Sequence, residues 1–215
     1  MQAMLSADDL TRLPDSELLQ RASKGDEAAF VTLYRRRQGS VYRFALRMSG
    51  SEAIAEDVTQ EVFLALLREA ARYDAARSSL ASYLFGIARN QVLRRLERER
   101  NYTPLPDNYE DEEASTLQAV ENPLGDLTRQ ETIEAVRQAV LALPPHYREV
   151  VVLCDLHELS YLETAEALGC VVGTVRSRLH RARALLGEKL RSLQTNNQMV
   201  KSKTEFSVLY EVPGI

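Results

Sequence analysis

Residues 159–186 constrain the fold more than any other stretch, because they encode two helices and the turn between them. Ser160 and Glu163 form a Ser-x-x-Glu capping box, which marks the start of a helix. Gly169 is placed to end that helix, because glycine readily takes the left-handed conformation found just beyond a helix. A second helix is expected to begin near Thr174. The stretch therefore predicts two helices joined by a turn of a few residues.

The second of these helices combines a narrow apolar stripe with a basic surface. Val175, Leu179, Ala182 and Leu186 recur three or four residues apart, so they share one side of a helix. Residues 174–191 contain six lysines and arginines and one acid. Such a helix suits the DNA major groove, where the planar guanidinium group of arginine can donate two hydrogen bonds to guanine. The alternative is a solvated basic face on an ordinary helical hairpin.

The composition indicates that any DNA contact comes from local patches. The 215 residues suffice for one large or two small domains, and their net charge is −4. The cysteines, Cys154 and Cys170, do not form the disulfide framework of a secreted protein. The sequence shows neither a signal peptide nor an apolar run of about 18 residues. We therefore expect a cytoplasmic protein that does not insert into a membrane.

A helix expected over residues 52–72 carries an acidic ridge beside its buried stripe. Residues 52–67 contain no lysine or arginine that would neutralise this ridge. The spacing supports equally a basic protein partner and a solvated acidic face. The ridge consists of residues at positions i, i+3, i+4 and i+7: Asp57, Gln60, Glu61 and Leu64.

A further helix, expected over residues 80–100, begins with aromatic residues and continues with arginines. Tyr83 and Phe85 lie early in it, and Asn90 and Arg94 follow. Aromatic rings stack on unpaired bases while guanidinium groups hold phosphates, so this pattern suits opened DNA. For each aromatic residue taken alone, a place in the core is a strong alternative.

The chain is predicted to be all-α, with two helical domains joined by a linker. Residues 101–127 contain seven acids, three prolines and no lysine or arginine, which is typical of a flexible linker. The first domain is expected over residues 15–100, after a loose amino terminus at residues 1–14. The second covers residues 128–192, and residues 193–215 are expected to form a disordered tail.

No pattern in the chain predicts an enzyme, a cofactor or a metal. Cys154 and His157 could both face a metal, with His146 one helix length away, but no second pair of ligands accompanies them. The sequence lacks a glycine-rich phosphate loop and a Gly-x-Ser-x-Gly motif. A further alternative is an autonomous helix-turn-helix regulator, but this leaves residues 52–100 without a task.

Two separated pairs of motifs occur in a fixed order. The first pair is AEDVTQEVFLALL (55–67) and SYLFGIARNQVLRRL (82–96). The second is YREVVVLCDLHELSYLETAEALG (147–169) and GTVRSRLHRARALL (173–186). They resemble the second and fourth conserved regions of the extracytoplasmic-function (ECF) group of bacterial RNA polymerase sigma factors. The resemblance implies a DNA-binding initiation factor that binds core RNA polymerase, directs it to promoters and helps to melt them.

The resemblance also implies a role for each candidate residue. Asp57, Gln60, Glu61 and Leu64 would dock on the clamp coiled coil of core polymerase. The loop at 73–81 would hold a base flipped from the minus-ten element. The residues implied in minus-ten binding and melting are Tyr73, Tyr83, Phe85, Asn90 and Arg94, and those implied in reading the minus-thirty-five element are Thr174, Arg176, Ser177, Arg178, His180 and Arg181.

Three departures from the family are visible, and one partner is implied. The family often has tryptophan where Tyr83 stands, and proline where Val171 stands; this chain has no tryptophan. The tail beyond Arg191 has no counterpart. The family is commonly held inactive by an anti-sigma protein, often anchored in the membrane, and its regulons are stress- or envelope-related. The resemblance therefore implies such a partner, which would hold this chain at the membrane.

Overall fold

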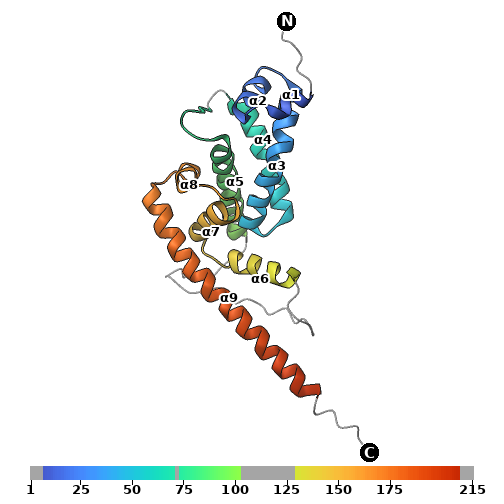
Figure 1. Cartoon of the computed structure of the whole chain (residues 1–215), viewed down its shortest axis with the longest axis vertical. Helices are drawn as coiled ribbons and strands as arrows, with labels where there is room; N and C mark the ends of the chain where they lie inside the picture. The colour runs from blue at the N-terminus through green and yellow to red at the C-terminus, as the bar shows by residue number, and fades with distance from the viewer. Residues whose placement is uncertain (1–6, 71–72, 103–128, 209–215) are drawn as a thin grey trace, which may run out of the picture.

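The computed structural model describes residues 7–70, 73–102 and 129–208, and every regular element in these ranges is a helix. The prediction of an all-α chain is therefore confirmed for these residues. Figure 1 shows the first five helices packed side by side in the upper half of the body. They are α1 (Ala7–Arg12), α2 (Asp15–Ala22), α3 (Glu27–Ser49), α4 (Glu52–Glu69) and α5 (Leu80–Tyr102).

Helix boundaries in this first group follow from local chemistry. The Asp26 side chain accepts a hydrogen bond from the backbone N–H of Ala29 at 3.0 Å and so caps the start of α3. Gly50 ends α3 in the left-handed conformation, with φ of 75°. The side chain of Ser51 then caps α4 by accepting from Ile54 N at 3.4 Å. These adjacent caps fold α4 back against α3.

The second group contains the predicted helix-turn-helix. The capping box is present, because Ser160 Oγ accepts from Glu163 N at 3.2 Å and Ser160 N donates to Glu163 Oε2 at 3.0 Å. Gly169 ends the helix in the left-handed conformation, as its position predicts. The group consists of α6 (Arg129–Leu141), α7 (Pro145–Val151), the π-helical turn η2 (Val152–Leu156), α8 (Tyr161–Leu168) and α9 (Val172–Val208).

The last helix is longer than expected. Its stripe of Val175, Leu179 and Ala182 is buried, but its backbone stays helical as far as Val208 and leaves the body of the molecule (Figure 1). The expected tail without regular structure is therefore helical over residues 193–208. No glycine or proline interrupts residues 188–212, so nothing in the sequence stops the helix within this range. Residues 209–215 and nearly all of the expected acidic linker lie outside the described residues.

The two groups of helices share one continuous hydrophobic core. Helix α5 packs against α8, and α3 packs against η2 and α7. His157, which follows η2, lies with its ring centroid 4.9 Å from that of Phe85 on α5 and 6.2 Å from that of Phe44 on α3. The sequence predicts two helical domains, but it contains no signal that they lie in contact.

Acidification is expected to destabilise this shared core through His157. Burial, helped by the positive charges of Arg47 and Arg43, lowers the pKa of His157 to about 4 from its ordinary 6.5. Between these values the unfolded chain binds a proton that the native chain does not, so the free energy of unfolding falls as the pH falls. We expect a loss of about 1–2 kcal/mol, less than the full shift implies because the ring is partly hydrated.

Urea denaturation at pH 7 and pH 4.5 measures this loss. The His157→Gln variant serves as the control, because glutamine cannot take up the proton but retains a similar length. The variant should lose less stability on acidification than the original chain. Equal losses in the two proteins would contradict a buried neutral His157.

Candidate nucleic-acid and protein interfaces

The acidic ridge lies on the outer face of α4. Asp57, Gln60 and Leu64 are exposed and Glu61 is half-buried, whereas the opposite side of the helix packs into the core. Leu64 is 53% exposed, and Leu67, one turn further on, is also exposed. The face therefore offers carboxylates with an apolar end, a combination suited to a protein partner with basic and apolar groups.

Two arginines lie beside the acidic ridge. Arg95 on α5 approaches Asp57 with 3.6 Å between NH2 and Oδ2, and Arg68 approaches Glu61 with 3.8 Å between NH2 and Oε2. Ion pairs whose carboxylates are open to solvent, as these are, contribute about 0–1 kcal/mol, so a partner can replace them at little cost. Arg95 could not be assigned from sequence because it belongs to a different helix.

Tyr73, in the segment before α5, packs against Tyr83 in the first turn of α5. The ring centroids of Tyr73 and Tyr83 are 5.4 Å apart, and Tyr73 Oη donates a hydrogen bond to the carbonyl oxygen of Ser78 at 3.1 Å. Burial, together with the negative charges of Asp15 and Asp74, raises the pKa of Tyr73. The structure thus brings together two of the residues expected at the minus-ten element.

Phe85, Asn90 and Arg94 lie on different sides of α5. Asn90 and Arg94 are exposed, as a DNA-contacting residue must be. Phe85 is only 4% exposed, and its ring centroid lies 5.3 Å from that of Phe44. In this arrangement Phe85 is a core residue, which is the alternative that the sequence also allowed, and it does not face solvent with Asn90 and Arg94.

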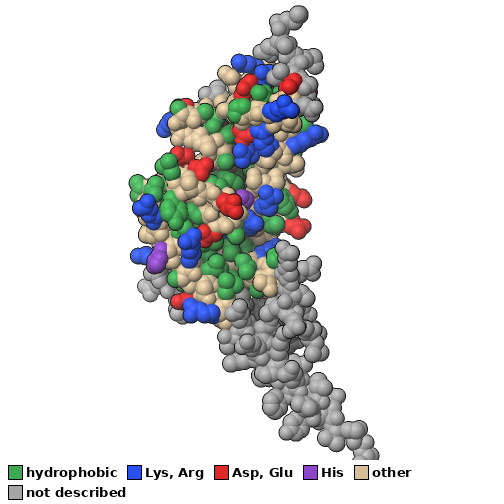
Figure 2. Space-filling view, viewed as in Figure 1, with side chains coloured by type: hydrophobic (Ala, Val, Ile, Leu, Met, Phe, Trp, Pro, Cys, Tyr) green, Lys and Arg blue, Asp and Glu red, His purple; other side chains and the backbone are tan. Residues whose placement is uncertain are grey.

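Helix α9 presents a polar face opposite its buried stripe. Arg176, Ser177, His180 and Arg181 are exposed, and Thr174 is half-buried. Figure 2 shows Lys, Arg and His side chains gathered over the part of α9 that adjoins the body. The exposed arginines can donate hydrogen bonds outward, so the geometry is compatible with insertion of this face into a major groove.

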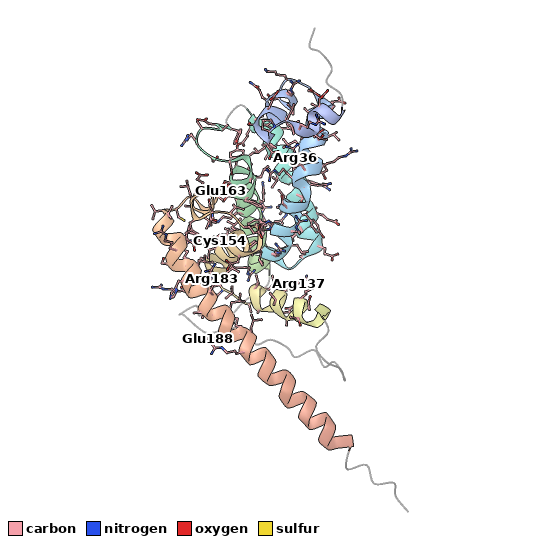
Figure 3. The ribbon with its side chains drawn as sticks, in the orientation of Figure 1. Arg36, Arg137, Cys154, Glu163, Arg183 and Glu188 are labelled. Carbon is pink, nitrogen blue, oxygen red and sulfur yellow. The ribbon has the colours of Figure 1, made fainter. Side chains whose placement is uncertain are left out.

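Three arginines of α9 also contact neighbouring protein groups. Arg178 is half-buried, with NH1 3.4 Å from Glu149 Oε1. Arg183 donates to the carboxylate of Asp155 through Nε at 3.1 Å and NH2 at 2.6 Å, and it points back toward the body (Figure 3). The guanidinium carbon of Arg176 lies 5.9 Å from the Tyr161 ring centroid. The α9 arginines therefore differ in how freely they can reach DNA.

The suggested metal ligands do not converge. Cys154 Sγ lies 3.3 Å from the hydroxyl of Thr164, and burial raises the pKa of its thiol. The His157 ring packs edge-on against the rings of Phe85 and Phe44. Within the described ranges, no group of three or more potential metal-ligating side chains is found. No helix in those ranges is long and apolar enough to cross a membrane.

Two family models match this chain, one in each group of helices. Residues 33–102 match Sigma-70 region 2, and residues 133–186 match Sigma-70 region 4. The ECF RNA polymerase sigma factor SigM of Mycobacterium tuberculosis is 38% identical over 186 residues, which cover 84% of this chain and 87% of that protein. SigW of Bacillus subtilis is 30% identical over 81% of this chain and 96% of that protein.

Two solved sigma-factor structures are similar to the structure of this chain. CnrH, solved in complex with the cytosolic domain of CnrY, is 26% identical and has a TM-score of 0.62, over 83% of this chain and 97% of that chain. RpoE of Bartonella quintana, solved with the anti-sigma factor NepR, has a TM-score of 0.55 at 25% identity, over 72% and 91% of the two chains. The chain therefore belongs to the ECF group of RNA polymerase sigma factors, which initiate transcription and are not enzymes.

Proposed function

We propose that this sigma factor divides its work between two exposed helix faces of opposite charge. Asp57, Gln60, Glu61 and Leu64 on α4 bind the clamp coiled coil of core polymerase. The exposed basic face of α9 binds the minus-thirty-five element. The observation that supports this assignment most strongly is that each face is exposed while the other side of its helix is buried. Residues 15–100 and 128–192 act as the two functional domains.

The promoter is opened by α5 and the loop that precedes it. Tyr73 and Tyr83 form an aromatic pair on which an unpaired base can stack, and Asn90 and Arg94 are exposed further along the helix. Captured bases favour the open strands over the duplex, so binding itself drives melting. Tyrosine at position 83 retains an aromatic surface in place of the tryptophan found in many relatives. The polymerase supplies the phosphoryl-transfer chemistry.

Two weak DNA contacts can give tight promoter binding if they act together. When one domain is bound, the other is held near its own promoter element at a raised effective concentration, so overall affinity exceeds that of either domain. Core polymerase fixes the distance between the two domains. The protein alone is therefore expected to bind promoter DNA weakly and its complex with polymerase to bind it tightly.

Regulation by an anti-sigma protein is part of this proposal. RpoE of Bartonella quintana was solved with the anti-sigma factor NepR, and CnrH with the cytosolic domain of CnrY. We propose a similar partner for this chain, which acts in the cytoplasm on a stress- or envelope-related regulon. A membrane-anchored partner would hold it at the membrane until released.

Binding of the purified chain to core polymerase without its own sigma subunit tests the proposal. The two should migrate as one complex in size-exclusion chromatography. Absence of the complex, combined with tight binding of the free chain to a palindromic operator, would favour an autonomous helix-turn-helix regulator.

A further inference from the structure

Three arginines of α9 contact groups outside their own helix, and the kind of partner differs among them. Arg178 and Arg183 each lie against a carboxylate, at 3.4 Å and 2.6 Å. Arg176 instead lies over an aromatic ring, with its guanidinium carbon 5.9 Å from the ring centroid of Tyr161 on α8. The contact that Arg176 makes with the neighbouring helix is therefore with an uncharged side chain.

An aromatic ring holds a guanidinium group in a different way from a carboxylate. A carboxylate accepts hydrogen bonds from the N–H groups, so it occupies these donors and neutralises the charge. The face of an aromatic ring attracts the cation as a whole and leaves the outward N–H groups without an acceptor. Arg176 is therefore restrained in position while its forked donors and its positive charge stay available to another ligand.

Arg176 lies where a recognition helix meets the edges of the bases. It is exposed in the first turns of α9, which begins at Val172, and the first residues of such a helix contact bases in the major groove. A guanidinium group donates two hydrogen bonds to guanine only when the two groups are correctly aligned. A freely rotating arginine loses conformational entropy on adopting that alignment, and a side chain that is already held loses less.

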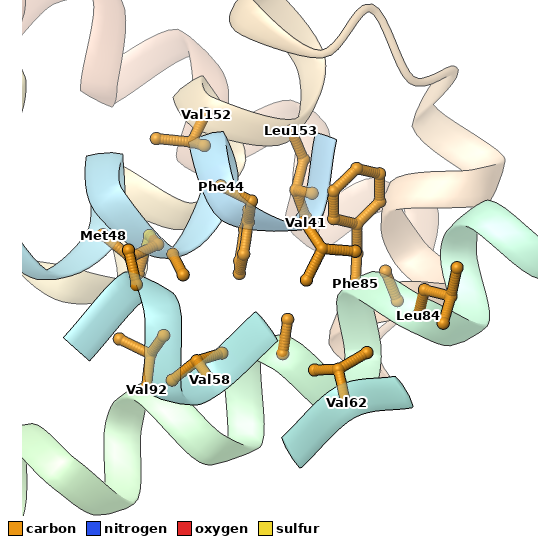
Figure 4. Packing of buried hydrophobic residues seen from close by; sticks show 14 of the residues in the cluster. Val41, Phe44, Met48, Val58, Val62, Leu84, Phe85, Val92, Val152 and Leu153 are labelled. Atoms are coloured by element: carbon orange, nitrogen blue, oxygen red, sulfur yellow. The ribbon is translucent and has the colours of Figure 1, made fainter. Parts of the chain in front are cut away.

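Tyr161 is held in place by the start of its own helix. The capping box of Ser160 and Glu163 flanks it, and α8 packs against α9. Phe44 and Phe85 lie among the buried side chains of the core (Figure 4), whereas Tyr161 is 39% exposed. The Tyr161 ring is therefore fixed at the surface, where it can support a side chain of α9.

We propose that Tyr161 is a positioning residue whose ring holds the guanidinium group of Arg176 in the orientation that reads one base pair of the minus-thirty-five element. The proposal deepens the proposed function and rests on it. Tyr161 acts through Arg176, and its hydroxyl group is not needed for this role. The base preference at the amino-terminal end of α9 therefore depends on a contact between both helices of the helix-turn-helix.

Binding of the sigma–polymerase complex to promoter duplexes varied one position at a time in the minus-thirty-five element tests this role. Arg176→Ala should remove the preference at one position. Tyr161→Leu, which removes the ring but keeps an apolar side chain, should lower affinity for the preferred base at that same position by roughly two- to fivefold. Adding Tyr161→Leu to Arg176→Ala should cost nothing further, because the ring then has no guanidinium group to hold.

Tyr161→Phe is the matched control, because phenylalanine keeps the ring and lacks the hydroxyl group. It should bind with the affinity and the base preference of the original chain. A loss in Tyr161→Phe that is equal for every sequence would identify the hydroxyl group as a phosphate contact and overturn the positioning role. Leu162→Ala removes a neighbouring side chain that is 61% exposed, and it should also leave the base preference unchanged.

NMR spectroscopy of the free full-length chain provides a measurement that does not depend on DNA. The side-chain protons of Arg176 should be shifted by the ring current of Tyr161. This shift should persist in Tyr161→Phe and disappear in Tyr161→Leu. Unchanged Arg176 resonances in a folded Tyr161→Leu chain would show that the ring does not hold the guanidinium group, which would overturn the proposal.

The outcomes separate this proposal from the proposed function. If the original complex shows no preference at any position of the minus-thirty-five element, the proposed function fails. If Arg176→Ala removes a preference that Tyr161→Leu leaves intact, only the positioning role fails. A loss of affinity in Arg176→Ala that is equal for every sequence would mean that Arg176 contacts a phosphate, and it would overturn the positioning role as well.

Discussion

Replacing Leu64 with aspartate is expected to abolish transcription initiation while leaving the fold intact. Leu64 is 53% exposed at the apolar end of the α4 ridge, so its replacement removes little core packing. If it is a central contact with core polymerase, a buried charge there costs about 2–4 kcal/mol, which is roughly a 30- to 1,000-fold loss of affinity. Titration of labelled core polymerase with each protein measures this loss.

Val31→Asp is the control for this experiment. Val31 is also an exposed apolar residue on a helix of the first group, with 42% of its surface accessible, but it lies on α3 and outside the ridge. Val31→Asp should bind polymerase like the original chain, and circular dichroism should show both variants folded. Equal binding by Leu64→Asp and the original chain would remove α4 from the polymerase interface.

Replacing Arg181 with alanine is expected to cost about 1–3 kcal/mol of promoter affinity and to relax the preference at one base pair. Arg181 is exposed on α9, on the face opposite the stripe of Val175, Leu179 and Ala182. Arginine can donate two hydrogen bonds to one guanine, and alanine donates none. Binding of the sigma–polymerase complex to duplexes varied one position at a time in the minus-thirty-five element measures both effects.

Arg183→Ala is the control, because it separates the loss of a base contact from a general weakening of the packing of α9. Its guanidinium group is already bonded to Asp155, so the substitution should weaken the packing of α9 without changing base preference. If Arg181→Ala lowers affinity equally for every sequence, Arg181 contacts a phosphate and does not read a base.

Local signals in the sequence suffice to predict the helix-turn-helix. The capping box at Ser160, the left-handed Gly169 and the buried stripe of α9 all depend on residues within a few positions of one another. Such patterns report directly on backbone hydrogen bonds and on which side of a helix is dry. The exposed face of α4 can likewise be predicted, because its residues recur three or four positions apart along one helix.

Contacts between distant segments could not be predicted in the same way. Arg89 on α5 donates a hydrogen bond to Glu149 on α7 at 2.6 Å, although the two residues are 60 positions apart. Phe85 packs against Phe44 and against the distant His157. The sequence does contain one hint, since Glu149 directly precedes the apolar run of residues 150–153, where an acid needs a partner. Nothing in the pattern identifies that partner as Arg89. Periodicity therefore predicts the helices but not how the two groups of helices pack together.

Run-off transcription with sigma-free core polymerase and a library of promoters tests the central claim most directly. We expect the protein to direct initiation from a subset of templates that share two separated elements. Leu64→Asp should abolish this initiation, and Arg181→Ala should change which templates are used. Initiation that is no higher with the protein than with core polymerase alone would contradict the account, even if α9 bound duplex DNA.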